Sequence, residues 1–163
     1  MKKSWKLAIK SLVGTVGAMV VVTGLFGGLM YLMFRPYDPT SEAELKTAYA
    51  ADFGKLPPAG ITVLKSRQVV ISDSGAQWLL LKATPEEIER HINMGFTKTD
   101  FPPGDFRDDA GANAPDWWQP PTNRLDLYEN NNWNKTGGWS WSSAAIGVDR
   151  GSNLIWFVAS KID

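Results

Sequence analysis

The chain has 163 residues, with 17 Lys and Arg, 17 Asp and Glu, one His and no Cys. This length fits one anchor and one domain of ordinary size, and the lack of cysteine excludes disulfides, thiolate nucleophiles and cysteine-ligated metals. The neutral total hides an asymmetry, because residues 1–36 carry five basic side chains and no acid, which leaves 12 basic side chains against 17 acids in the remainder. An acid-leaning domain without a basic cluster argues against nucleic acid as a partner.

Residues 12–34 contain no charged side chain. At about 1.5 Å per residue, a helix of this length crosses the ~30 Å hydrocarbon core of a bilayer. Four lysines precede the stretch and only Arg35 closely follows it, so we expect residues 1–11 to be a cytoplasmic tail. The stretch is longer than the apolar part of a cleaved signal peptide, which favours an uncleaved signal anchor. The expected location is the bacterial inner (cytoplasmic) membrane, with a periplasmic or extracellular C-terminal domain.

Small side chains recur within this stretch at spacings of three and four. They are Gly14, Gly17, Val21, Gly24 and Gly28. On a helix they share one face, and the last two have the small-xxx-small spacing at which membrane helices pack closely. The partner is then another integral membrane protein or a second copy of the chain. The alternative is a chance alignment, because glycine is common in membrane helices.

Residues 35–40 are expected to form a short linker before a domain over 41–163. Ser41 and Glu44 have capping-box spacing, which predicts a helix up to Gly54. A second helix is predicted over 84–94, because a Thr cap, a Pro at the first helical position and two acids begin it.

The strand signals lie on either side of this second helix. Strands are expected at residues 61–64, 69–72, 77–82, 125–128, 139–148 and 154–159. Residues 78–81 are apolar without alternation, which indicates a central strand covered on both faces. Residues 97–122 are rich in Pro, Asp, Gly and Asn and are expected to form a long loop. The predicted fold class is α+β: an N-terminal transmembrane helix, then a small antiparallel sheet of about five strands with two helices packed on one face.

The densest group of oxygen ligands lies in the long loop. Its candidate calcium ligands are Asp105, Asp108, Asp109 and Asp116. Their order does not match the EF-hand loop and Arg107 competes for the carboxylates, so a solvated acidic loop is favoured and no metal is assigned. The single histidine, His91, is expected to be structural, and no nucleophile or cofactor motif is recognisable. We therefore expect a protein that is not an enzyme and has no cofactor.

Tryptophan is abundant near the Asn- and Gly-rich segment at residues 130–138. The candidates for exposed surface contacts are Trp133, Trp139 and Trp141. An exposed indole ring can stack on a sugar or anchor a protein interface. The alternative is that these rings form the core of a small domain without cysteine.

Several short segments resemble small, functionally uncharacterised bacterial envelope proteins that are anchored in a membrane. The segments are residues 56–59, 83–88, 116–121, 148–149 and 154–157. The resemblance implies an extracytoplasmic α+β domain and carries over no active site.

Two functional hypotheses follow from the sequence. The first is a non-catalytic single-pass subunit that packs by its glycine-lined helix on a larger membrane protein complex, and covers or stabilises that complex on the extracytoplasmic side. The alternative is a membrane-tethered binding module for glycan or peptide that uses exposed tryptophans.

Overall fold

A computed structural model describes residues 16–17, 19–31, 35–71, 74–100, 102–108, 113–133 and 141–161. The chain divides into two compact units, Met1–Arg35 and Pro36–Asp163. In the first unit, residues 16–17 and 19–31 are helical and their side chains are exposed. Among the described residues, no helix is both long and apolar enough to cross a membrane. The predicted span at residues 12–34 includes residues outside this description at both of its ends.

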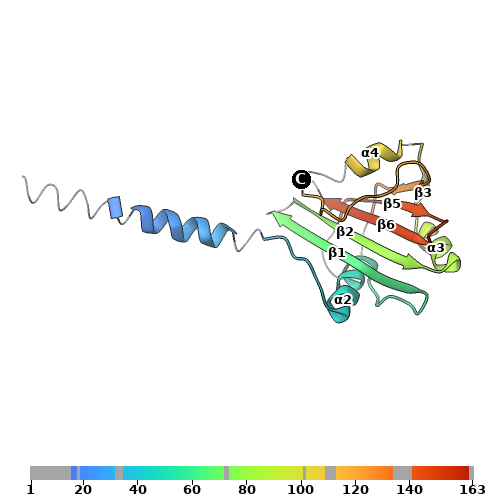
Figure 1. The fold of residues 1–163 in the computed structure, drawn as a ribbon, viewed down its shortest axis with the longest axis horizontal. Coiled ribbons are helices and arrows are strands. Elements are labelled where there is room, and N and C mark those ends of the chain that lie inside the picture. Colours follow the sequence, from blue (N-terminus) through green and yellow to red (C-terminus); the bar gives the residue numbers. More distant parts are fainter. Residues whose placement is uncertain are drawn as a thin grey trace, which may run out of the picture. The chain divides into compact units, whose positions relative to one another are not determined.

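The second unit contains three helices and six strands among its described residues. In chain order these are α2 (Glu42–Phe53), β1 (Ile61–Ile71), β2 (Ser74–Ala83), α3 (Pro85–Ile92), β3 (Thr97–Lys98), α4 (Pro103–Asp108), β4 (Asp126–Asn130), β5 (Ser143–Asp149) and β6 (Leu154–Lys161). The strands form one antiparallel sheet in the order β1-β2-β6-β5-β4-β3 (Figure 1). The α+β class is confirmed. The sheet has six strands rather than about five, because the segment expected as a loop adds β3 to the edge of β4 and also forms α4.

Both longer helices begin at the residues that the sequence indicates. The Ser41 hydroxyl accepts a hydrogen bond from the Glu44 N–H, and the Glu44 carboxylate accepts one from the Ser41 N–H, which completes the capping box. The Thr84 hydroxyl caps α3 by accepting a hydrogen bond from the Glu87 N–H. Gly54, with φ of 70°, ends α2 in the left-handed conformation that glycine adopts without steric cost.

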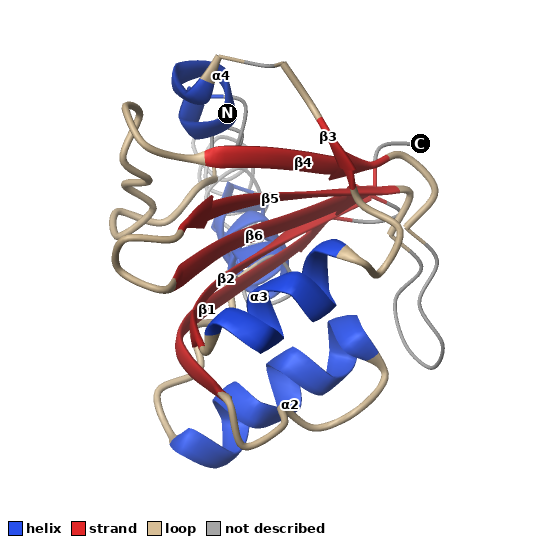
Figure 2. Ribbon diagram, turned by 90° about the vertical axis from the view of Figure 1, so that its right-hand side faces the viewer, coloured by secondary structure: helices blue, strands red, loops and turns tan. Residues whose placement is uncertain are grey.

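The sheet is covered on both faces (Figure 2). Helices α2 and α3 pack on one face, against side chains such as Leu79, Leu81 and Phe157. On the other face, α4 and the chain after it contribute Phe106 and Trp118 to a second apolar cluster. Strand β2 lies inside the sheet and its side chains reach both clusters, as the apolar run at residues 78–81 predicted.

A β-bulge in β1 decides which side chains of that strand reach which face. Val63 pairs with Leu81, but Lys65 pairs with Leu80, so Leu64 is an extra residue in the ladder. Because side chains alternate along a strand, one extra residue reverses the faces of everything that follows. Val63 therefore joins the cluster beneath α2 and α3, whereas Val69 joins the cluster beneath α4.

The contact between α4 and the sheet depends on a position without a side chain. A Cβ atom at Gly147 of β5 would lie 2.8 Å from the ring of Phe106 and 3.2 Å from Leu125. The Phe106 ring also packs on Trp118, which in turn packs on Trp156, with ring centroids 5.4 and 5.5 Å apart. Gly147 thus permits these aromatic rings to rest directly on the strand.

We predict that Gly147→Ala lowers the free energy of unfolding by about 1–3 kcal/mol, because the added methyl group overpacks the site beneath Phe106. The measurement is urea denaturation of the purified protein. Gly104→Ala is the matched control, since nothing lies within 4 Å of a Cβ atom at that position of α4. In a Phe106→Ala background the cost of Gly147→Ala should shrink. An equal cost in both backgrounds would contradict this explanation.

Candidate functional site

The described small residues of the N-terminal helix form one exposed face. Gly17, Val21, Gly24 and Gly28 are exposed, and spacings of four, three and four residues place them on one side of a helix. Nothing lies within 4 Å of a Cβ atom at any of the three glycines. Gly14, the first member of the predicted face, lies outside the described residues.

Trp133 and Trp141 lie in the core and not on the surface, where we expected them. They are only 5% and 2% exposed. Three phenylalanine rings surround Trp133, with centroids 5.1–5.9 Å from its own, and they belong to segments far apart in the chain: Phe53, Phe96 and Phe157. The expectation of surface contacts through these two side chains is therefore corrected. Trp139 lies outside the described residues.

Trp141 also forms a buried polar contact. Its Nε1–H donates a hydrogen bond of 2.9 Å to Oδ1 of Asp52, an α2 carboxylate that is 0% exposed. Burying a carboxylate without hydrogen bonds is costly, so this donor stabilises the packing of α2 on the sheet. Gln77 of β2 makes a similar link, since its Nε2 donates to the Ala48 carbonyl oxygen. The polar side chains in this core thus join α2 to the sheet.

His91 has a structural role, as expected. Its Nδ1 lies 2.7 Å from the Glu87 carbonyl oxygen, so Nδ1–H donates there, and its Nε2 then accepts from the Tyr49 hydroxyl at 2.9 Å. Burial lowers the pKa of His91 and raises the pKa of Tyr49. Both ring nitrogens are therefore hydrogen-bonded: Nδ1 within α3 and Nε2 to α2, and His91 is neutral near pH 7.

We predict that His91 makes the domain less stable in mild acid. Because the folded state lowers the pKa of His91, the unfolded chain takes up the proton more readily, and stability falls as the pH decreases through about 6.5, the ordinary histidine value. His91→Gln should reduce the difference in unfolding free energy between pH 7.5 and 5.5, as measured by urea denaturation. Tyr49→Phe keeps the buried imidazole and should retain the difference. An unchanged difference in His91→Gln would show that other groups set it.

The candidate calcium ligands do not form a described cluster. Asp105 is exposed on α4, and Asp116 is exposed in the turn before Trp117. Asp109 and the side chain of Asp108 lie outside the description. In the part of the chain that the structure describes, no group of three His, Asp or Glu residues is placed to hold a metal ion.

The residues expected as a linker are bonded to the sheet. Tyr37 and Gln68 of β1 exchange backbone hydrogen bonds of 2.8 and 2.9 Å. Next to them, the Arg67 guanidinium donates two hydrogen bonds of 2.6 and 2.7 Å to the Asp38 carboxylate, an interaction that raises the pKa of Arg67. We call these four residues the β1 clamp. No local pattern in the sequence indicates it, because its halves are 29 residues apart.

We predict that Arg67→Ala releases the clamp while leaving the core intact. The amide protons of Tyr37 and Gln68 should exchange with solvent faster, whereas those of β2 and β6 should keep their protection, because a partly exposed ion pair contributes at most about 1 kcal/mol to global stability. Hydrogen exchange followed by mass spectrometry measures both. Arg67→Lys keeps the charge but not the two parallel hydrogen bonds, so it should restore protection only in part. Unchanged exchange at Tyr37 in Arg67→Ala would contradict the prediction.

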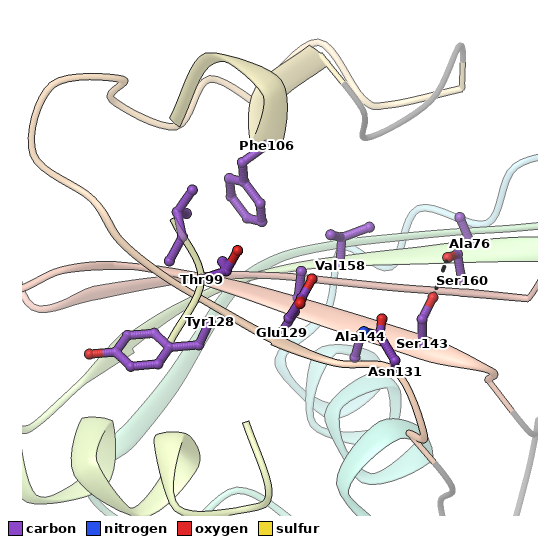
Figure 3. Close-up of a pocket in the computed structure, with 12 residues that line it drawn as sticks. Ala76, Thr99, Phe106, Tyr128, Glu129, Asn131, Ser143, Ala144, Val158 and Ser160 are labelled. Atoms are coloured by element: carbon purple, nitrogen blue, oxygen red, sulfur yellow. Dashed lines mark hydrogen bonds between the residues drawn. The ribbon is translucent and has the colours of Figure 1, made fainter. Parts of the chain in front are cut away.

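The sheet carries an open groove of about 300 Å³ on the side of α4 (Figure 3). Phe106 reaches over it from α4, and Ala145 of β5 and Val158 of β6 lie along it. At one end the hydroxyl groups of Ser143 and Ser160 are 3.1 Å apart. No local pattern in the sequence indicates this groove, because its residues come from six separate segments of the chain.

Comparisons with protein-family models, with curated proteins and with solved structures find no match to this chain.

Proposed function

We propose that the protein is a non-catalytic single-pass membrane subunit. Residues 12–34 serve as the anchor, the domain lies on the extracytoplasmic side, and the glycine-lined helix face packs on a larger membrane protein complex that the domain covers or stabilises. The observation that carries the proposal is an apolar helix whose described small residues, Gly17, Val21, Gly24 and Gly28, lie on one exposed face.

The composition of the N-terminal helix supports its placement in an apolar environment. Its large side chains point outward on every side, and Met19, Leu25 and Phe26 are each between 63% and 71% exposed. A helix that is apolar all round needs to be buried in a lipid or protein environment. The charge asymmetry of the first 36 residues supports a cytoplasmic N-terminus.

The small-residue face supports helix packing as the mode of attachment. Without side chains at Gly24 and Gly28, another helix can approach the backbone closely, and van der Waals contact then provides the association energy. Larger side chains lie on the opposite side, at Met19 and Phe26, about 140–180° around the helix from Gly24 and Gly28 at 100° per residue. The two sides of the helix therefore differ in how closely they admit a neighbour.

The second unit is ordered from its first residues onward, which supports a folded domain that begins directly after the proposed anchor. The β1 clamp bonds its first residues to the sheet by two backbone hydrogen bonds and a bidentate ion pair. A membrane-tethered binding module for glycan or peptide is the second candidate function. Its expected tryptophans Trp133 and Trp141 are buried, so such a module would bind through other residues.

We predict that Gly24→Leu and Gly28→Leu separate the protein from its membrane partners. Each substitution adds a branched side chain to the packing face, which keeps a neighbouring helix at a distance. The measurement is affinity purification from native membranes in a mild detergent, with identification of the proteins that co-purify. Wild type should be recovered in a complex with other membrane proteins, and the two variants should lose it.

The matched controls change the opposite side of the helix. Met19→Leu and Phe26→Leu alter large side chains away from the glycine face and should keep the complex. Recovery of the wild type as a lone monomer, or equal recovery of the complex with Gly24→Leu and Phe26→Leu, would contradict the proposal. Recovery of copies of this chain alone would identify the partner as a second copy.

A further inference from the structure

The groove beneath α4 results from an uneven distribution of side-chain size across one face of the sheet. Residues paired across neighbouring strands form rows on that face. One row contains Trp156 of β6 and Gly147 of β5, which pair directly. Phe106 and Trp118 fill the space above this row, and Trp156 is only 6% exposed. This half of the face is closed.

The next two rows on the same face are occupied mainly by small residues. The first of these rows consists of Trp78 of β2, Val158 of β6 and Ala145 of β5. The second consists of Ala76 of β2, Ser160 of β6 and Ser143 of β5. Ala and Ser side chains do not rise far from a sheet, so the cover provided by Phe106 leaves a hollow beside it. At about 300 Å³ the hollow is at the lower end of the range for small-molecule sites.

The charge that lines the hollow is negative. Glu129 of β4 extends the row of Val158 and Ala145, since it pairs with Ala145. It is the only charged side chain among the described residues that line the groove, and no lining residue is basic. Within the described chain, no ion pair or hydrogen bond engages its carboxylate, whereas the nearby Asp126 carboxylate is shared by Lys98 and Arg150. The groove thus combines an apolar floor with one carboxylate available to a ligand.

We propose that this groove binds a primary ammonium group carried on an aliphatic stem, as in a lysine side chain. The stem lies on Ala145 and Val158 beneath the Phe106 ring, and the ammonium group donates hydrogen bonds to the Glu129 carboxylate. A charge-assisted hydrogen bond of this kind is about twice as strong as a neutral one, so the charge of the ligand decides recognition. The site is independent of the membrane anchor, so neither proposal depends on the other.

The test uses the full chain, purified in detergent micelles, and amide chemical shifts measured by NMR. The probe is Nα-acetyl-lysine amide, and its matched control is the same compound acetylated on Nε, which keeps the stem but loses the charge. We expect saturable shifts at the amides of Glu129, Ala145 and Val158, with a Kd on the order of 1 mM. The neutral control should bind at least roughly tenfold more weakly.

Two variants locate the interaction. Glu129→Gln removes the charge at nearly constant size and should weaken binding of the lysine probe roughly tenfold or more. Ala145→Leu fills the floor of the groove and should abolish the shifts while Glu129 remains. Glu42→Gln is the matched control, because it neutralises an exposed acid on α2, and α2 packs on the opposite face of the sheet. It should bind as wild type does.

Several results would overturn the proposal. They are equal binding of the charged and the acetylated probe, unchanged binding in Glu129→Gln, or no saturable shift with either probe. Saturable binding of N-acetylglucosamine at these amides, tighter than that of the lysine probe, would assign the groove to a neutral sugar instead. If Glu129→Gln loses the dispersed spectrum of a folded protein, Ala145→Leu together with the acetylated probe decides the question.

Discussion

The antiparallel pairing of β2 with β6 holds the domain together. It runs over eight residue pairs, from Gly75 with Lys161 to Lys82 with Leu154. This pairing joins the hairpin formed by β1 and β2 to the other four strands of the sheet. Because both strands lie inside the sheet, their side chains alternate between two covered faces. The two apolar clusters both depend on this register.

The two faces use different means to pack their covers. On the side of α2 and α3, the core is continuous and aromatic, and hydrogen bonds from Trp141 to Asp52 and from Gln77 to Ala48 join α2 to the sheet. On the side of α4, large rings gather over Gly147 and leave small residues uncovered beside them. The face beneath α2 and α3 therefore mainly stabilises the domain. The face beneath α4 contains the groove to which we assign a ligand.

The elements with local signals were predictable from the sequence. The capping signal at the start of α2 or α3 is contained in four consecutive residues. Ser41 and Thr84 were therefore sufficient to place the two helix starts. The apolar run at residues 78–81 correctly indicated an inner strand. In contrast, β3 and α4 are two and six residues long and depend on β4 and on the aromatic cluster for their stability, so residues 97–122 resembled a loop.

By itself, the sequence determined the charge asymmetry of the chain, the uncharged stretch with its small-residue spacing, the helix starts and the α+β class, because each follows from residues close together in the chain. Only the tertiary structure decided the order of the strands, the burial of Trp133 and Trp141, the β1 clamp and the groove beside Glu129. The physical reason is the sequence separation of the contacts. Asp38 meets Arg67 across 29 residues and Asp52 meets Trp141 across 89, and no local pattern specifies which distant side chain will fill a given space.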